Sequence, residues 1–482
     1  MAKFVPFFIN SNLITDDNDI SCVENYRKTI GKNIGNSYIS WSIIKELYGG
    51  FVKPHHIKNI FQYNFSHCEE DIDFINNECT HCFLVLQDQI RMNICEHDAN
   101  VYKNLSKFIE QIKVNLIVMS IGANQYFCYN PYEMKFEDKT LPLDDFSKNI
   151  NKNLINLLHV ISHKTSVIGI RGEYTQDVFK KFGIDNVQVI GCPSYFENGK
   201  NRIVEKKTFE EIKNVLISSP YNAFFGNKTF EQVNKNTDFN VQDEEVFVKT
   251  LFGGFQDGIQ RYMDILPRSY LFSDIDSWKK FVKQHDFCWG YRIHGTVLSL
   301  NSGVPALFCP PDIKGTEMAK AFNIPYLNKI LTKENFKEVY ENVDYSFMNE
   351  SYQCRYENFK NFMENNGIEL NEEKKENTYE TQPTAITRFH RGKSSDFEEL
   401  DIKIEDVLLK NVHLKKELVL TKKTLVDKLE ILTAKNEILL KEVIKSHKLN
   451  NLRIRLLSHI TFGKTKQYYQ KKWREIKKVL EK

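Results

Sequence analysis

Short apolar runs alternate with amphipathic stretches between about residue 30 and residue 330. The apolar runs are rich in β-branched residues, and each is followed by polar, Gly, Ser or Asn positions, as expected of buried strands. Near-continuous apolar strands between helices are typical of parallel sheets that are covered on both faces. The pattern therefore predicts an α/β fold. The clearest runs are residues 83–86, 116–119, 166–170, 187–190, 215–217 and 306–309.

A polar and charged segment near residues 198–207 separates two series of these strands. We therefore predict two Rossmann-like domains that face each other across a cleft, at residues 1–205 and 206–368. The second domain is expected to end in a closing helix at residues 352–364. Residues 369–398 are polar, poor in aliphatic side chains and broken by Pro383, which predicts a linker.

Between residues 399 and 448 the apolar period changes to steps of three and four. This heptad seam, with Lys and Glu on the other faces, predicts a coiled coil. Asn411 and Asn436 fall on the seam, where a buried Asn favours one register and strand number, so we expect a parallel homodimer. The alternative is one long amphipathic helix packed on the body. The remaining seam positions are Leu400, Ile404, Val407, Leu414, Leu418, Leu425, Leu429, Leu432, Leu439 and Val443.

Residues 449–482 predict an amphipathic basic helix. Tyr469, Trp473, Ile476 and Leu480 share one face, and from residue 451 onward ten Lys or Arg stand against two Glu. Aromatic residues on an apolar stripe beside a cationic face are typical of a helix that lies in a membrane interface. We expect peripheral attachment at the inner face of the cytoplasmic membrane. A solvated basic tail, or a helix that docks on a partner, is the alternative.

Composition narrows the possible partners. The net charge is +3 and the tail contributes +8, so the first 450 residues sum to −5, which argues against nucleic acid as their partner. Ten scattered cysteines fit a reducing cytoplasm. The run Cys79-Thr80-His81-Cys82 lacks the second ligand pair that structural zinc sites usually have, so we expect buried thiols and neither a metal nor another cofactor. The chain lacks a run of about 18 apolar residues, so no membrane span is expected.

The segment Arg292-Ile293-His294-Gly295 places a permanent cation two residues from a titratable imidazole. An arginine grips phosphate or carboxylate through its fork of donors, and histidine suits proton transfer near neutral pH. Gly295 opens an expected helix, whose free N–H groups favour an anion. We predict that Arg292 and His294 are catalytic and that Gly295 contacts the substrate. The alternative is a core histidine beside an arginine in a structural ion pair.

Three further segments follow the pattern of a ligand site. Arg171 and Asn124 come directly after expected strands, and ligands of open α/β sheets bind at the carboxyl ends of strands. Gly35 and Asn36 precede a helix expected at residues 38–48, where a glycine with polar neighbours can cradle an anion. The structural alternatives are a surface arginine at a helix start and an ordinary N-cap.

Together these residues resemble the polysaccharide pyruvyl transferase family. The resemblance rests on Asn33-Ile34-Gly35-Asn36, on Ile170-Arg171-Gly172-Glu173, on Gly191-Cys192-Pro193 and on Arg292-Ile293-His294-Gly295 with Gly303-Val304-Pro305. These segments occur in the family's order over about residues 30–330. Asn36 and Cys192 stand where many members have Asp.

The resemblance implies a GT-B-like fold and transfer of a carboxyvinyl group from phosphoenolpyruvate to a sugar hydroxyl, which forms a ketal. Arg171 and Arg292 would then bind the donor anion, His294 would act as general acid or base, and Lys314 and Glu317 would join the substrate-binding residues. The acceptor would be a bacterial surface polysaccharide or its lipid-linked precursor. Two alternatives stay open: a glycosyltransferase that uses a nucleotide sugar, and a non-catalytic scaffold of a glycan-assembly complex.

Overall fold

The computed structural model describes residues 7–9, 33–48, 57–130, 132–133, 135–218, 236–242, 268–272 and 275–370. By its contacts the chain divides into Met1–His390 and Arg391–Lys482, and every described residue lies in the first unit. The linker from residue 371 onward, the coiled coil at 399–448 and the basic helix at 449–482 lie outside the described residues. These elements stay predictions, as do the homodimer and the membrane attachment inferred from them.

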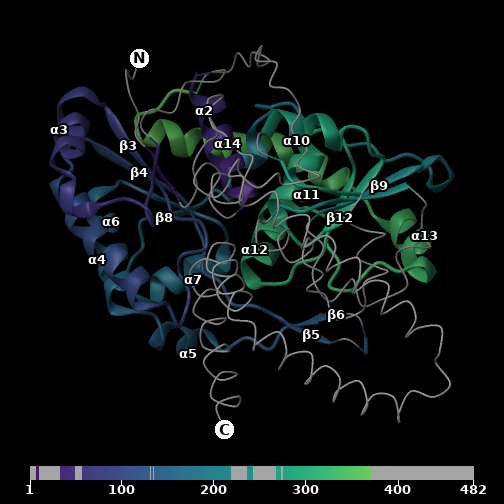
Figure 1. The fold of residues 1–482 in the computed structure, drawn as a ribbon, viewed down its shortest axis with the longest axis horizontal. Coiled ribbons are helices and arrows are strands. Elements are labelled where there is room, and N and C mark those ends of the chain that lie inside the picture. The colour runs from purple at the N-terminus through teal and green to yellow at the C-terminus, as the bar shows by residue number, and fades with distance from the viewer. Residues whose placement is uncertain are drawn as a thin grey trace, which may run out of the picture. The chain divides into compact units, whose positions relative to one another are not determined.

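The first sheet is parallel and has six strands in the order β2-β1-β3-β4-β7-β8. Its strands β3, β4 and β8 are labelled in Figure 1. Its strands are β1 (Phe7–Ile9), β2 (Ile57–Asn59), β3 (His81–Val85), β4 (Asn115–Ile121), β7 (Ile168–Ile170) and β8 (Val187–Val189). The helical elements of this half are α2 (Ile34–Tyr48), η1 (Phe65–His67), α3 (Glu69–Glu78), α4 (Glu96–Gln111), α5 (Leu143–Lys148), α6 (Lys152–Lys164), α7 (Glu173–Lys181) and η2 (Pro193–Phe196). The strand order reverses between β1 and β3, which marks a topological switch point.

The second sheet is also parallel and has five strands in the order β11-β10-β9-β12-β13. Its strands are β9 (Asn214–Ser218), β10 (Asn236–Asn240), β11 (Ser269–Tyr270), β12 (Phe287–Gly290) and β13 (Ala306–Phe308). Its helical elements are η3 (Phe209–Glu211), α10 (Ile275–Val282), α11 (Ile293–Asn301), α12 (Ile313–Phe322), α13 (Lys333–Asn342) and α14 (Ser346–Asn365). Along the chain the strand order is 3-2-1-4-5, as in the Rossmann fold, with its switch point between β9 and β12. The predicted α/β class with parallel sheets is confirmed.

Several elements differ from the expectations. The helix expected at residues 38–48 begins at Ile34, and the one expected at residues 352–364 begins at Ser346. The apolar pattern misses β1, β2, β10, β11 and β12, because these strands have two to five residues and β2 and β10 are largely polar. It also misses an antiparallel hairpin of β5 (Cys128–Asn130) and β6 (Lys135–Glu137). Among the helices that the structure describes, none is long and apolar enough to cross a bilayer.

The strands of the first sheet alternate between two hydrophobic cores, as the two-residue period of a strand requires. In β3, Cys82 and Leu84 belong to a core within the first half, whereas Phe83 and Val85 belong to a larger core. The larger core continues through η2, the second sheet and α14. The two sheets are therefore joined by continuous apolar packing.

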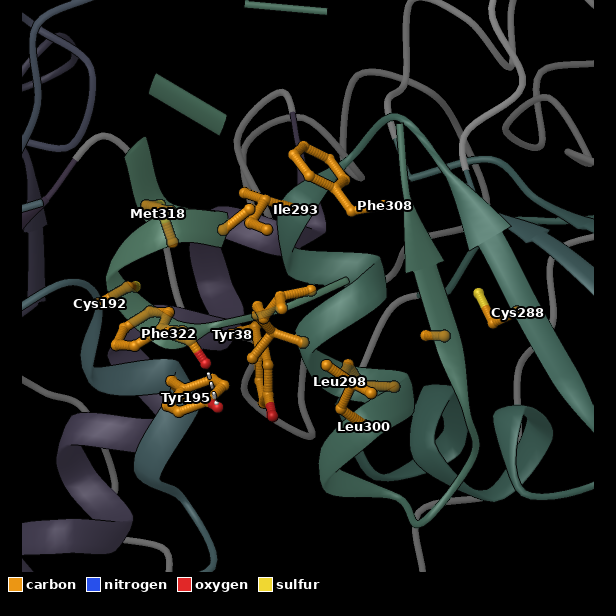
Figure 2. Packing of buried hydrophobic residues seen from close by; sticks show 14 of the residues in the cluster. Tyr38, Cys192, Tyr195, Cys288, Ile293, Leu298, Leu300, Phe308, Met318 and Phe322 are labelled. Atoms are coloured by element: carbon orange, nitrogen blue, oxygen red, sulfur yellow. Dashed lines mark hydrogen bonds between the residues drawn. The ribbon is translucent and has the colours of Figure 1, made fainter. Parts of the chain in front are cut away.

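Figure 2 shows part of this shared core, around Tyr195 of η2 and Phe322 of α12. Their rings stack with 3.9 Å between centroids, and the Tyr195 hydroxyl donates to the Phe322 carbonyl oxygen at 3.0 Å. The Arg202 guanidinium lies 4.1 Å from the ring centroids of both Tyr195 and Tyr352. Such desolvated cation–π contacts contribute about 2 kcal/mol, so they hold η2 firmly to α14.

The helix α14 follows the second sheet in sequence but pairs with the last strand of the first. Asn358 donates from Nδ2 to the Val189 carbonyl oxygen at 2.9 Å and accepts from Gln188 Nε2 at 3.1 Å. Phe362 packs against β7, where an added Cβ on Gly169 would lie 3.0 Å from its ring. The first sheet is thus completed by a distant part of the chain.

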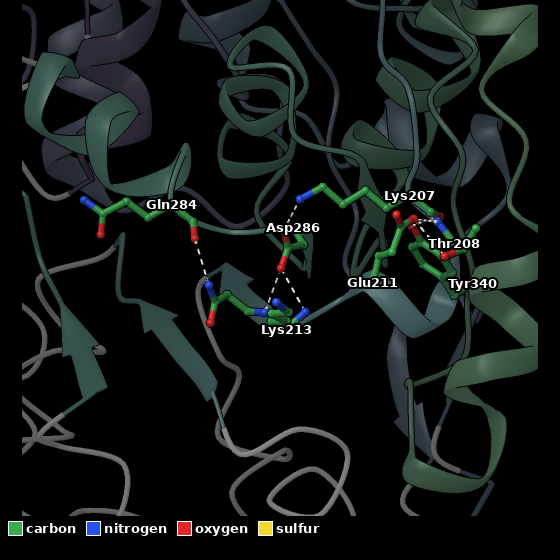
Figure 3. Close-up of polar contacts among 8 residues, drawn as sticks. Lys207, Thr208, Glu211, Lys213, Gln284, Asp286 and Tyr340 are labelled. Atoms are coloured by element: carbon green, nitrogen blue, oxygen red, sulfur yellow. Dashed lines mark hydrogen bonds and ion pairs between the residues drawn. The ribbon is translucent and has the colours of Figure 1, made fainter.

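One carboxylate, that of Asp286, fixes the segment that leads into the second sheet (Figure 3). Its Oδ2 accepts from the backbone N–H groups of Lys213 and Asn214, each at 2.9 Å, and its Oδ1 accepts from Lys207 Nζ at 2.5 Å. Tyr340 of α13 donates from its hydroxyl to the Lys207 carbonyl oxygen at 2.8 Å. These bonds determine where β9 begins, and hence where its carboxyl end lies.

We expect Gly191→Ala to destabilise the protein more than Gly183→Ala does. Both glycines have left-handed φ, 72° and 69°, which costs an alanine roughly 1–2 kcal/mol. At Gly183 an added Cβ meets nothing within 4 Å, whereas at Gly191 it overlaps the Phe322 ring. Overpacking typically adds about 1–3 kcal/mol. Urea unfolding of both variants measures the difference, and equal losses would show that Phe322 moves aside freely.

Candidate active site

Arg171 lies at the carboxyl end of β7, in the first half. It is only 2% exposed, and its Nε donates to Ser120 Oγ at 3.1 Å. Its Nη2 is buried without a hydrogen-bond partner among the described residues. A buried guanidinium normally has all its donors satisfied, so Arg171 presents a charge and a free donor at this end of the sheet.

The backbone next to Arg171 has an irregular conformation that leaves room for its side chain. Ser120 and Gln87, at the ends of β4 and β3, both have left-handed φ, 59° and 51°, which is uncommon outside glycine and concentrates at functional sites. A register shift in β4 between Val118 and Ile121 accompanies the turn at Ser120, as in a β-bulge that re-aims a side chain. At Gly122 an added Cβ would lie 2.8 Å from Arg171 Cδ, so a glycine lets the arginine pass.

His294 lies in the first turn of α11, which begins at Ile293, two residues before the helix opening expected at Gly295. The side chain is buried, and its Nε2 lies 3.7 Å from the Cys192 thiol. Burial first, and then the charges of Arg171 and Lys314, hold the pKa of His294 well below its ordinary value, while Asp88 opposes them. The imidazole is therefore neutral at physiological pH and available to accept a proton.

Lys314 is paired with carboxylates on both sides of the junction between the halves. Its Nζ donates to Asp88 Oδ2 at 2.7 Å and lies 3.5 Å from Asp312 Oδ2. Although burial opposes ionisation, the charges of Lys314 and Arg171 hold the pKa of Asp88 below its usual range. An anionic substrate that binds Lys314, as predicted, must therefore compete with an ion pair that is already present.

Glu317 is engaged in a second bridge between the halves. Its two oxygens accept from the Thr175 backbone N–H at 3.0 Å and from the Thr175 hydroxyl at 2.6 Å. The same hydroxyl accepts from the Ala123 N–H at 2.8 Å. Burial raises the pKa of Glu317 to about 7, with the Thr175 bonds and the Arg171 charge opposing the rise. The contacts describe a positioning residue that ties α12 to the start of α7.

The remaining predicted residues are distributed around this centre. Gly35 and Asn36 lie inside the first turn of α2 rather than in a loop before it, and Gly35 packs against His294, 2.9 Å separating its would-be Cβ from the histidine Cβ. Arg292 is the N-cap residue of α11, and its charge contributes to lowering the pKa of His294. Asn124 is buried, with its Oδ1 unpaired in the described structure, and no hydrogen bond links it to Arg171.

Sequence reasoning missed Gln87, Asp88, Ser218 and Gln242, which also lie at the carboxyl ends of strands. Gln87 and Asp88 follow the run at residues 83–86, and Ser218 follows the run at 215–217, so the strand-end rule that selected Arg171 would have found all three. Gln242 follows β10, whose polar sequence gave no strand signal.

The cysteine-rich segment is separate from this site. Cys68, Cys79 and Cys82 are buried and form no disulfide, and burial raises the pKa of Cys79 to about 11. Within the ranges that the structure describes, no group of three His, Cys, Asp or Glu side chains is arranged to hold a metal ion.

Arg171 and His294 lie at the ends of different parallel sheets, and the charge of Arg171 acts on the imidazole of His294. Residues 94–312 match the polysaccharide pyruvyl transferase family. The matched segment covers a little under half of the chain and includes Arg171, Arg292 and His294. The matched segment is therefore similar to a family of transferases of polysaccharide biosynthesis. None of the curated proteins matches the chain.

Three solved structures are among those similar to this chain. A Listeria monocytogenes protein assigned as a UDP-N-acetylglucosamine 2-epimerase has 12% identity and a TM-score of 0.33, with 63% of this chain and 78% of that chain covered. MnaA of S. aureus with UDP has 11% identity, a TM-score of 0.32 and coverage of 63% and 77%. A variant of the wall teichoic acid polymerase TagF has 10% identity, a TM-score of 0.30 and coverage of 86% and 90%. These values are too low to support an argument about this chain.

We expect Glu317→Gln to change how stability depends on pH. Because the pKa of Glu317 is raised to about 7, its contribution to stability is complete below about pH 4.5 and is lost as the pH rises through about 7. Glutamine does not titrate: its carbonyl oxygen can accept from the Thr175 N–H, while its NH2 group would have to donate to the Thr175 hydroxyl instead of accepting from it. That exchange shifts stability equally at all pH values, so relative to the wild type the variant should still gain on the order of 1–3 kcal/mol across this window. Urea unfolding at several pH values measures the gain.

The exposed Glu338 of α13 provides the control, since Glu338→Gln should leave the pH profile parallel to that of the wild type. A Glu317→Gln profile that is also parallel would show that Glu317 stays ionised throughout.

Proposed function

We propose that the protein transfers the carboxyvinyl group of phosphoenolpyruvate to hydroxyl groups of a sugar and releases phosphate. The observation that carries the proposal is that Arg171, buried with an unpaired Nη2, acts through its charge on a buried His294 in the other half, whose pKa lies well below its ordinary value. One group suits an anion and the other suits a proton, and the family match gives the class of transferase.

Charge balance favours Arg171 as the first contact of the donor. Lys314 already has Asp88 and Asp312 as counter-ions, so an anion that binds it must compete with them. The unpaired Nη2 of Arg171 can bind an anion without breaking an ion pair, although the Arg171 charge also lowers the pKa of Asp88. Phosphoenolpyruvate carries both a phosphate and a carboxylate, either of which fits the fork of a guanidinium.

The proton chemistry follows from the neutral state of His294. Its imidazole takes the proton of one sugar hydroxyl as that oxygen bonds to C2 of the donor, and passes the proton to C3, which becomes the methyl group. A second hydroxyl then displaces phosphate from C2, with its proton leaving on the phosphate, and the ketal is complete. Donor binding neutralises part of the Arg171 charge, which raises the basicity of His294 when it is needed.

We expect Arg171→Met to weaken phosphoenolpyruvate binding about 10- to 100-fold, because a charged hydrogen bond contributes roughly 1.5–3 kcal/mol. Arg171→Lys retains the charge but not the planar fork of donors, so its affinity for phosphoenolpyruvate should lie between those of Arg171→Met and the wild type. The shift of the unfolding midpoint with ligand concentration measures the affinity. Stabilisation of the wild type by a nucleotide sugar and not by phosphoenolpyruvate would instead favour the glycosyltransferase alternative.

We expect anion binding to be accompanied by proton uptake at His294. Sulfate is the probe, because it does not titrate near neutral pH, and calorimetry in two buffers of different ionisation enthalpy counts the protons. The measurement uses a Glu317→Gln background, since the pKa of Glu317 is about 7 and it also senses Arg171. Uptake should increase as the pH is lowered towards about 6.5, the ordinary pKa of a histidine, and disappear in His294→Asn. Equal uptake in both proteins would assign the proton to another group.

A further inference from the structure

A group of buried, uncharged polar side chains lies at the carboxyl ends of two neighbouring strands of the second sheet. Ser218 ends β9 and Gln242 follows β10, beside the switch point between β9 and β12. Both residues are fully buried, and neither the Ser218 hydroxyl nor the Gln242 carboxamide has a hydrogen-bond partner in the part of the chain that is described. Each unpaired buried group lowers the stability of the fold by about 1–3 kcal/mol.

Two glycines place this group against the catalytic histidine. At Gly35 an added Cβ would lie 2.5 Å from Gln242 Nε2 and 2.9 Å from His294 Cβ. At Gly295 it would overlap Ser218 Oγ and lie 3.0 Å from Gln242 Oε1. The Gln242 carboxamide therefore lies between the first turns of α2 and α11, with Ser218 and His294 beside it.

More groups of the same kind surround this point. Asn240 pairs with Ser218 across β10 and β9, so their side chains share one face of the sheet, and both amide atoms of Asn240 are unpaired among the described residues. Thr296, in the first turn of α11, has an unpaired buried hydroxyl by the same measure. None of these four side chains carries a charge.

The chemistry of this group differs from that of the first half. Amides and hydroxyls both donate and accept, as sugar hydroxyls do, whereas an anion only accepts and gains most from a cation such as Arg171. We propose that Ser218 and Gln242 bind hydroxyl groups of the acceptor sugar next to His294. This inference rests on the proposed function, since it assigns the second substrate of the same site. A sugar held there presents a hydroxyl to the imidazole that takes its proton.

A sugar must part the first turn of α2 from Gln242 to reach these groups, because they are closed to solvent. The contact that it would replace is the backbone hydrogen bond from the Ile34 N–H to the Gln242 carbonyl oxygen, 3.2 Å long. Gly35 occupies the position that would otherwise fill this space with a side chain.

Calorimetric titration of the full-length chain with methyl glycosides of galactose, glucose and mannose, in the presence of saturating sulfate, tests the proposal. Gln242→Met keeps the shape and removes the carboxamide, and Ser218→Ala removes the hydroxyl. Each should weaken glycoside binding about 3- to 10-fold, the loss of one neutral hydrogen bond, and leave sulfate binding within about twofold of wild type. Ser40→Ala is the matched control: its hydroxyl, in α2, is also buried and unpaired in the described ranges, and glycoside binding should not change.

Gln242→Met loses a group that has no partner, so its urea midpoint should equal or exceed that of the wild type, which excludes unfolding as the cause. The proposal fails if no glycoside binds wild-type protein that binds sulfate, or if the variants weaken sulfate as much as glycosides. It also fails if uridine binds in place of the glycosides and depends on Gln242. Glycoside binding in a protein that binds neither sulfate nor phosphoenolpyruvate would defeat the proposed function and leave this acceptor site standing.

Discussion

The buried charge of Arg171 is the constraint on which the rest of the site depends. Moving a cation out of water is costly unless neighbouring groups compensate it. Here Ser120 turns its hydroxyl towards the guanidinium through a left-handed backbone and a bulge in β4, and Asp88 stays ionised partly because of the Arg171 charge. Burial, and then the same charge together with that of Lys314, lowers the pKa of His294 in the other half. The Arg171 charge thus contributes to the ionisation state of both its acidic and its basic neighbours.

Polar contacts between the two halves accompany the apolar packing that joins them. Glu317 reaches Thr175, Lys314 reaches Asp88, and the start of α2 reaches Gln242. Each contact joins the carboxyl end of one sheet to an element of the other. The arrangement of the carboxyl ends of the two sheets therefore depends partly on short, directional bonds, which respond to ligands and pH more readily than packed side chains do.

The sequence predicted the α/β class for a simple physical reason. Buried parallel strands leave long apolar runs, and the polar residues that follow them lie at one edge of a sheet, which made Arg171 a candidate. His294 became a candidate through its spacing from Arg292, since the pattern missed β12, the strand before it. Lys314 and Glu317 came from family resemblance, and their bonds to Asp88 and Thr175 depend on contacts between residues more than 140 positions apart. Gln242 was out of reach because the strand before it is polar and short.

The crossing of α14 from the second sheet back to β7 and β8 means that the chain has no clean dividing point at residue 205. The first sheet and its covering helix are encoded in separate stretches, with the whole second sheet between them. Recombination between related genes could exchange only the first 205 residues. The strand β8 would then come from one gene and the helix α14 from the other, and the contacts of Asn358 and Phe362 would have to fit a sheet with which they had not evolved. The unit of inheritance in this fold is therefore discontinuous in the gene, although it is continuous in space.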